Sequence, residues 1–187
     1  NDLRSAIERD ELMLFYQARV DVPQGRMVGA EALMRWQHPR RGLVPPGEFI
    51  PVAEESGLIV PITAWVLREA CRQLKQWQDD GLPVVRVSVN LSTYSFREDG
   101  LSDLIRAALR EYGIAPSLLE GEITESMLMQ DVDGTVKRLQ DLRSMGLELS
   151  MDDFGTGYSS LAFLKRLPLD VLKIDRSFVK DVLTDAH

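Results

Sequence analysis

The sequence predicts one α/β domain in which parallel strands carry polar side chains to the same end of a sheet. Five polar residues each stand at the end of an apolar run, at intervals of 59, 32, 30 and 21 residues: Glu31, Asn90, Glu122, Asp152 and Lys173. An interval of about 30 residues is roughly one strand and one crossover helix. Because each such unit returns the chain to the same end of the sheet, these side chains are expected to converge, as they do at the catalytic face of a (β/α) barrel.

The N-terminal part is expected to form a short helix, two strands, a second short helix and then a long helix. Pro23 and Gly25 mark the turn between the two strands. Pro61 and Gly81 bound the long helix, whose apolar residues recur at helical spacing. The elements that precede the long helix are expected at residues 3–10, 12–20, 27–36 and 45–57.

After Gly81 the sequence alternates between strands and helices. Gly113, Gly146 and Pro168 each follow a segment of helical periodicity and end it. The strands are expected at residues 84–91, 119–124, 147–154 and 171–175, and the helices at residues 101–112, 136–142 and 159–167. Together with the two N-terminal strands, this gives about six strands in one domain that spans residues 1–187.

The oxygen donors of the polar residues predict a divalent metal ion. Carboxylates that point into one buried mouth repel each other, and without a cation some of them would take up protons. Carboxylate and amide oxygens suit Mg²⁺, Mn²⁺ or Ca²⁺. The chain has one Cys and two His, which excludes an ordinary Cys/His zinc site. Cys71 lies on the apolar face of the long helix and is interpreted as an inert core thiol. A single Cys leaves no intrachain disulfide, which is compatible with a reducing compartment.

Composition limits the classes of partner. The 187 residues are 44% hydrophobic and 27% charged, which is enough to bury a core. A net charge of −7 without a basic run disfavours non-specific binding to long nucleic acids, whereas a metal site would still admit a small anionic ligand. The sequence contains no secretory segment and no long apolar span, so it is not expected to insert in a membrane. Because the first residue is Asn and not Met, we expect a piece of a longer polypeptide or a trimmed start.

Several of these polar residues also have a structural explanation when they are taken alone. Glu31 by itself would more often be a solvated or hydrogen-bonded carboxylate, and Asn90 could cap a turn. Asp152 and Asp153 could cap a helix. Lys173 is harder to explain in this way, because a buried Lys needs partners. The presence of all these residues together favours a metal site.

The string Glu31-Ala32-Leu33 resembles the signature of the EAL domain family, the cyclic di-GMP phosphodiesterases. The resemblance runs from Tyr16-Gln17 to Phe178-Val179 and includes six motifs in the order of the family. These are Glu31-Ala-Leu-Met-Arg35-Trp36, Pro51-Val-Ala-Glu-Glu-Ser, Asn90-Leu-Ser, Glu122-Ile-Thr-Glu125-Ser, Asp152-Asp153-Phe-Gly-Thr-Gly-Tyr-Ser-Ser and Lys173-Ile-Asp175. The resemblance implies a modified TIM barrel whose first strand runs antiparallel to the others.

The resemblance also implies roles for individual residues. The first metal would be held by Glu31, Asn90, Glu122 and Asp152. Asp152 would bridge to a second metal, which Asp153 also binds. The reaction would depend on Glu31 and on Lys173, which holds or activates the attacking water.

Three further residues would act on the substrate or on a loop. Arg35 would grip a phosphate, and Gln17 would also bind the substrate. Glu125 would steady the loop that follows Asp153, and that loop would couple the metal site to a dimer contact.

The chain departs from the usual family pattern in three ways. Ala18 stands where a Pro is common, and Gly121 stands where an apolar strand residue is usual, which should weaken that strand locally. The last motifs of the family, a Glu near the next strand and a later Gln-Gly, do not occur before His187. Because a TIM-type barrel typically needs about 250 residues, we expect the C-terminal part of the barrel to be absent from this chain.

Three functional hypotheses follow. Two cations about 4 Å apart suit in-line attack on a phosphodiester. The favoured hypothesis is therefore hydrolysis of cyclic di-GMP to linear pGpG with Mg²⁺ or Mn²⁺. This reaction would lower the level of this second messenger in bacterial signalling. The resemblance also implies inhibition by Ca²⁺. The alternative is a receptor domain that binds cyclic di-GMP with little or no cleavage. A third hypothesis, which rests on the chemistry of the residues and not on the resemblance, is an enolase-like lyase with Lys173 as base.

The resemblance further implies a setting for this domain. It is expected to form a homodimer and to be fused to sensory or diguanylate cyclase-like domains. It is expected to act in the cytoplasm, either as a cytoplasmic protein or as the cytoplasmic part of a membrane-anchored one.

Overall fold

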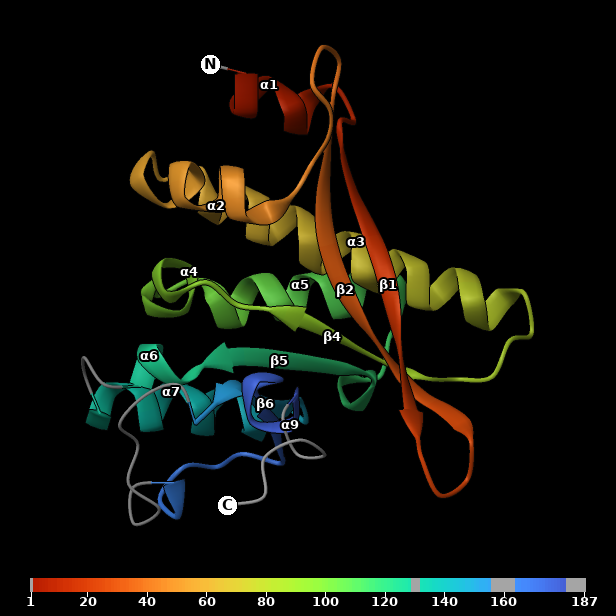
Figure 1. The fold of residues 1–187 in the computed structure, drawn as a ribbon, viewed down its shortest axis with the longest axis vertical. Coiled ribbons are helices and arrows are strands. Elements are labelled where there is room, and N and C mark those ends of the chain that lie inside the picture. The colour runs from red at the N-terminus through yellow and green to blue at the C-terminus, as the bar shows by residue number, and fades with distance from the viewer. Residues whose placement is uncertain (1, 129–131, 156–163, 181–187) are drawn as a thin grey trace. The chain divides into compact units, whose positions relative to one another are not determined.

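The structure, a computed structural model, describes residues 2–128, 132–155 and 164–180 (Figure 1). The chain divides into two compact units, Asn1–Leu119 and Glu120–His187, and each is described by itself. None of the helices within the described ranges is long and apolar enough to cross a membrane.

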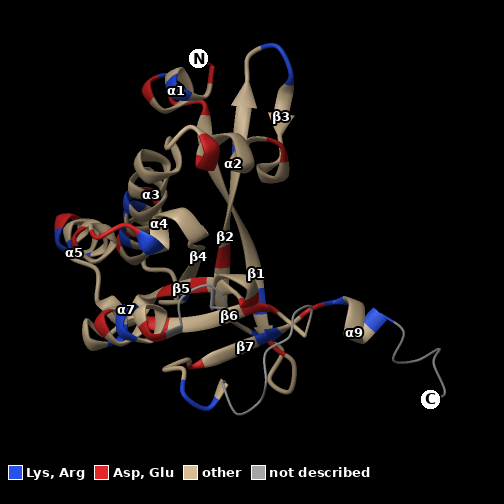
Figure 2. Ribbon diagram, turned by 90° about the vertical axis from the view of Figure 1, so that its left-hand side faces the viewer, with Lys and Arg blue, Asp and Glu red and all other residues tan. Residues whose placement is uncertain are grey.

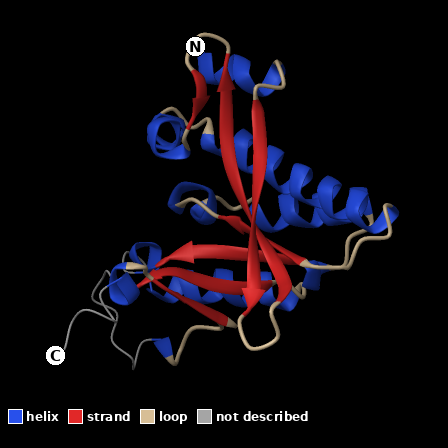
Figure 3. Ribbon diagram, turned by 45° about the vertical axis from the view of Figure 1, so that its right-hand side comes forward, coloured by secondary structure: helices blue, strands red, loops and turns tan. Residues whose placement is uncertain are grey.

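The first unit is built around a long antiparallel pair of strands (Figure 3). In this pair, Gln17 lies opposite Glu31 and Met13 lies opposite Arg35. The second strand also pairs in parallel with the fourth, where Glu31 lies beside Ser88. The first strand is therefore antiparallel, as predicted. The strands are β1 (Leu12–Asp21), β2 (Arg26–His38), β3 (Gly42–Val44) and β4 (Arg86–Asn90).

Helices pack on this sheet and supply most of the core of the first unit. The longest helix buries an apolar stripe at helical spacing that includes Ile62, Leu67 and Leu74. On the sheet side, Tyr16 meets Trp77 of this helix edge to face, with 5.0 Å between the ring centroids. The helices are α1 (Asp2–Glu8), α2 (Pro46–Glu55), α3 (Ile59–Asp79), α4 (Thr93–Arg97) and α5 (Leu101–Tyr112), followed by a 3-10 turn, η1 (Pro116–Leu118).

The second unit contains parallel strands with a helix between them. Its core is formed by apolar residues such as Ile123, Leu139 and Leu149, which are fully buried. Thr124 lies beside Asp152 in the register of the first two strands, which aligns their carboxyl ends. The elements are β5 (Leu119–Thr124), α6 (Glu125–Leu128), α7 (Val132–Ser144), β6 (Glu148–Phe154), β7 (Val171–Ile174) and α9 (Ser177–Lys180).

Charged residues of both signs are mixed along the outer faces of α3, α5 and α7 (Figure 2). Several form pairs one helical turn apart, such as Lys75 with Asp79 at 2.6 Å and Arg72 with Glu69 at 2.7 Å. Such exposed pairs contribute only about 0.3–0.5 kcal/mol each. Stability therefore depends on the buried apolar faces and not on these pairs.

Several short elements differ from the sequence prediction. The described residues form seven strands, where about six were expected, because β3 adds three residues that pair with the end of β2. The predicted helix at 136–142 begins earlier, at Val132, and the predicted strand at 84–91 spans only Arg86–Asn90. The short helices α4, α6 and α9 were not predicted, because they are too short to show a helical period. The helix predicted at 159–167 lies mostly outside the described residues.

Burial in α3 predicts an unreactive thiol. Cys71 is fully buried, and burial raises the pKa of its thiol to about 12, with a smaller contribution from the charge of Glu111. At pH 8 only about one molecule in ten thousand would carry the reactive thiolate. We therefore expect a disulfide reagent to label the native protein very slowly at pH 8 and to label one equivalent rapidly in guanidinium chloride. Rapid labelling without denaturant would show that this face of α3 is open.

Candidate functional site

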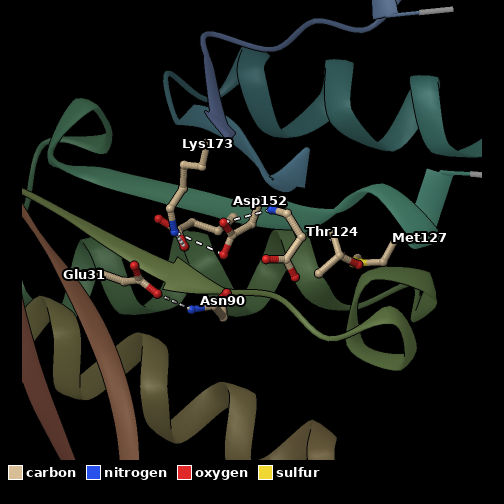
Figure 4. A network of polar contacts seen from close by, with 8 residues as sticks. Glu31, Asn90, Thr124, Met127, Asp152 and Lys173 are labelled. Atoms are coloured by element: carbon tan, nitrogen blue, oxygen red, sulfur yellow. Dashed lines mark hydrogen bonds and ion pairs between the residues drawn. The ribbon is translucent and has the colours of Figure 1, made fainter. Parts of the chain in front are cut away.

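Two site candidates of the first unit are joined by a hydrogen bond. Glu31 lies on β2, and Asn90 is the last residue of β4, the strand that runs parallel to it. Asn90 Nδ2 donates to Glu31 Oε1 at 3.0 Å (Figure 4). Because the amide nitrogen is the donor, the amide oxygen Oδ1 is the atom of Asn90 that can bind a metal. The bond therefore orients both groups as oxygen ligands.

The chain segment after Asn90 is fixed by a row of hydroxyl groups. Ser92 caps α4, where its side chain accepts a hydrogen bond from the Ser95 backbone at 3.1 Å. The Ser95 hydroxyl lies 2.7 Å from that of Thr63 on α3, in a buried contact. The sequence analysis did not identify these residues, although Ser at a helix start is a common capping signal. They hold the end of β4, where Asn90 lies, against the helical layer.

The substrate candidates of the first unit share a face with Glu31. Directly opposed residues of an antiparallel pair point to the same side, so the register places Gln17 beside Glu31. Arg35 is four residues after Glu31 and faces the same side, opposite Met13. Gln17 is exposed and Arg35 is half-buried. One face of β1 and β2 thus carries a carboxylate, an amide and a guanidinium.

In the second unit, a lysine joins two carboxylates at neighbouring strand ends. Lys173 Nζ of β7 donates to Glu122 Oε2 of β5 at 2.7 Å and to Asp152 Oδ2 of β6 at 3.1 Å (Figure 4). Glu122 is fully buried, and the other two side chains are about three-quarters buried. Two negative charges face one positive charge in this group. The excess of negative charge and the oxygen donors fit a divalent cation.

Asp153 breaks the alternation of β6. Adjacent side chains on a regular strand point to opposite faces, but Asp153 has a φ of 56° and its backbone N–H donates to Asp152 Oδ1 at 3.0 Å. The register with β7 also shifts between Met151 and Phe154. This is the irregular strand end that two adjacent acidic ligands would require.

The loop after Asp153 is held by contacts with two other elements. Glu125, the buried first residue of α6, accepts a hydrogen bond from the Gly155 backbone at 3.2 Å. Gly155 has a φ of 101°, and a Cβ there would lie 2.6 Å from the ring of Phe178. Gly157 and Tyr158 of this motif lie outside the described residues. The Glu125 contact is the one that a loop-supporting role needs, and the role itself stays a prediction.

Asp175 has a structural explanation in the structure. It lies just before α9, where it accepts hydrogen bonds from the side chain and the backbone of Ser177. These bonds hold the pKa of the Asp175 carboxyl below its ordinary value. Asp175 therefore caps the helix that carries Phe178.

Comparisons with known proteins identify relatives over the whole chain. The model of the EAL domain family matches residues 1–187. The chain is 50% identical over 186 residues to the bifunctional diguanylate cyclase/cyclic di-GMP phosphodiesterase MucR of Pseudomonas aeruginosa, covering 100% of this chain and 27% of that protein. It is 46% identical over 181 residues to the cyclic di-GMP phosphodiesterase NbdA of the same organism, covering 97% of this chain and 23% of that protein. The chain thus spans about a quarter of the length of these relatives.

A solved structure, described as the PaMucR phosphodiesterase in complex with c-di-GMP, has the same fold. It matches with a TM-score of 0.93 and 51% identity, over 99% of this chain and 75% of that chain. The predicted fold class, the modified barrel with an antiparallel first strand, is therefore confirmed.

The bridge from Lys173 to Glu122 and Asp152 predicts that the stability contributed by each of these three charged groups depends on the other two. We expect Lys173→Met, measured by urea unfolding in EDTA, to lower the free energy of unfolding by about 2–4 kcal/mol, because it leaves the buried Glu122 carboxylate without this cation. The loss should be smaller in a Glu122→Gln background. The control, Lys75→Met, removes an exposed pair with Asp79 and should change stability by at most about 0.5 kcal/mol. Equal effects of the two lysine variants would contradict the dependence.

The Gly155 contact predicts an indirect effect of Glu125. We expect Glu125→Ala to weaken Mg²⁺ or Mn²⁺ binding about tenfold, or to weaken dimer formation, because the loop after Asp153 loses its acceptor. Glu125→Gln keeps an acceptor oxygen and should retain most of the affinity. Titration calorimetry and analytical ultracentrifugation measure the two properties. If neither changes in Glu125→Ala, the loop-supporting role is wrong.

Proposed function

The chain belongs to the EAL domain family, and from this premise we propose that it hydrolyses cyclic di-GMP to linear pGpG with Mg²⁺ or Mn²⁺. The observation that carries the proposal is the bridge from Lys173 to Glu122 and Asp152 at the carboxyl ends of parallel strands. The family motifs that bear Glu31, Asn90 and Arg35 are also present in the sequence. Every matched position of the family's metal site thus keeps its oxygen ligand.

The relatives support the proposed substrate and reaction. MucR and NbdA are both described as cyclic di-GMP phosphodiesterases, and each is at least 46% identical to this chain. The MucR phosphodiesterase structure contains c-di-GMP. The family model that matches residues 1–187 is that of the EAL domain, which favours the phosphodiesterase over an enolase-like lyase.

The proposed metal ligands are Glu31, Asn90, Glu122 and Asp152 for a first ion, and Asp152 with Asp153 for a second. All of them offer oxygen, which fits Mg²⁺ and Mn²⁺. When bound, such a pair of ions lowers the pKa of water and offsets charge on phosphate oxygens.

The side chains of the chain supply orientation and charge. Lys173, held by Glu122 and Asp152, would orient the attacking water or stabilise developing negative charge. Glu31, held by Asn90, would keep one carboxylate geometry through the reaction. Arg35 would hold a non-bridging phosphate oxygen, for which its planar fork is suited, and Gln17 would contact the substrate on the same face.

We also propose the setting of this activity. The homodimer would be coupled to the metal site through the loop that Glu125 holds. The relatives are about four times longer than the chain, and one is the oxygen sensor protein DosP of Escherichia coli, at 46% identity. Sensory or diguanylate cyclase-like domains would therefore regulate the activity, and the reaction would take place in the cytoplasm.

The proposal is tested by incubating the protein with cyclic di-GMP and Mg²⁺ or Mn²⁺ and measuring pGpG by chromatography. We expect turnover with either ion, none in EDTA, and inhibition by Ca²⁺. Tight binding of the nucleotide without pGpG would instead show a receptor domain.

The role of Glu31 is tested in the same assay. Glu31→Ala should lower the rate by roughly a thousandfold or more, because a ligand of the catalytic metal is lost. Its fold should survive, because the hydrogen bond from Asn90 that the variant removes typically contributes only about 1 kcal/mol. Glu8→Ala, an exposed acidic residue of α1, is the control and should leave turnover unchanged. Near-normal turnover by Glu31→Ala with both ions would exclude the metal assignment.

A further inference from the structure

An aromatic ring lies on the face of β1 and β2 that carries the substrate candidates. Tyr16 points to the helical layer, where it meets Trp77. Its neighbours Phe15 and Gln17 point to the opposite face, because side chains alternate along a strand. In the register, Phe15 lies opposite Leu33, between the pairs that contain Arg35 and Glu31. Phe15 is 46% exposed, so its ring is open to this face.

The ring of Phe15 contacts the guanidinium of Arg35. The guanidinium carbon lies 5.6 Å from the ring centroid, within the range of a cation–π interaction. A second contact also restrains the group, since Arg35 Nη1 donates to the Met34 carbonyl at 2.8 Å. One N–H of the five in the guanidinium is used in this bond. The ring restrains the group without accepting a conventional hydrogen bond.

We propose that Phe15 is a positioning residue that holds the Arg35 guanidinium ready for a phosphate of the substrate. This inference rests on the proposed function, in which Arg35 binds phosphate. A carboxylate in the place of Phe15 would also hold Arg35, but it would neutralise the charge and compete with the phosphate. An aromatic ring restrains the cation and leaves its charge for the ligand.

The position of Phe15 predicts which kinetic constant changes. Arg35 would hold the phosphate both before and during the reaction, and an interaction of this kind lowers KM with little effect on kcat. Loss of the ring should therefore raise KM about two- to fivefold, the range for one exposed cation–π contact, and leave kcat within about twofold. If the ring instead contacted the nucleotide directly, its loss would still raise KM in a variant that lacks Arg35.

The first measurement needs no nucleotide. In Phe15→Leu the arginine Nε–Hε signal of Arg35, assigned by its absence in Arg35→Lys, should lose a ring-current shift in nuclear magnetic resonance spectra. Phe15→Tyr keeps a ring and should keep the shift. Val20→Ala, a change at a 53% exposed residue of the same strand, is the control. An Arg35 signal that is the same in Phe15→Leu and the native protein would overturn the proposal.

The second measurement is a double-mutant cycle with cyclic di-GMP. Phe15→Leu should raise KM in the native background, Phe15→Tyr should restore it, and Phe15→Leu should have no further effect in Arg35→Ala. A further loss in Arg35→Ala would overturn the positioning role, because it would show that the ring contacts the nucleotide. If the native protein shows the ring-current shift but neither binds nor cleaves cyclic di-GMP, the proposed function fails while the contact between Phe15 and Arg35 is supported.

Discussion

Parallel strands that end at one edge place carboxylates close together, and the repulsion between them is the constraint that the second unit must satisfy. Glu122 and Asp152 occupy neighbouring strand ends, and Lys173 of the next strand donates to both. A fully buried carboxylate is stable only with such compensation. Lys173 brings one positive charge to two carboxylates, so negative charge is in excess among these three side chains. The group of Glu122, Asp152 and Lys173 thus holds the strand ends together without metal, and its excess of negative charge also favours a metal.

The same constraint explains the irregular backbone beyond Asp152. A regular strand would turn Asp153 away from its neighbour, and the left-handed conformation at Asp153 avoids this. Such a conformation is uncommon for a residue other than glycine, although Asp adopts it more readily than most, and contacts of the next residues support it. The support comes from Glu125, which accepts the Gly155 N–H, and from Phe178, whose ring packs where a side chain at Gly155 would lie. The helix that carries Phe178 thus lies against the loop that follows the two acidic residues.

The sequence was sufficient for the long elements, and it indicated candidate site residues whose roles stay predictions. The apolar periodicity of α3 and the strand-to-strand intervals depend on many residues, so they are visible without a structure. The intervals also indicated Glu31, Asn90, Glu122, Asp152 and Lys173 as one set, although they gave no partner for any of them. Short elements such as β3 and α6 were missed, because they depend on pairing and capping contacts that a period does not show. The contact between Phe15 and Arg35 was missed because it depends on the register of β1 with β2, which the sequence leaves undetermined.

The two cations of the site candidates differ in the partners that hold them. Lys173 is bound by carboxylates, so its charge is compensated and its main effect is to fix the geometry of acidic groups. Among the residues that the structure describes, the partners of Arg35 are a carbonyl oxygen and an aromatic ring, which are both neutral. Its charge therefore remains for an anion, and its orientation is fixed before the anion arrives. In a chain with a net charge of −7, a doubly anionic ligand would meet general repulsion, and a cation held by these two neutral groups gives it a local point of attraction. The ring of Phe15 thus matters because it restrains Arg35 and leaves its charge intact.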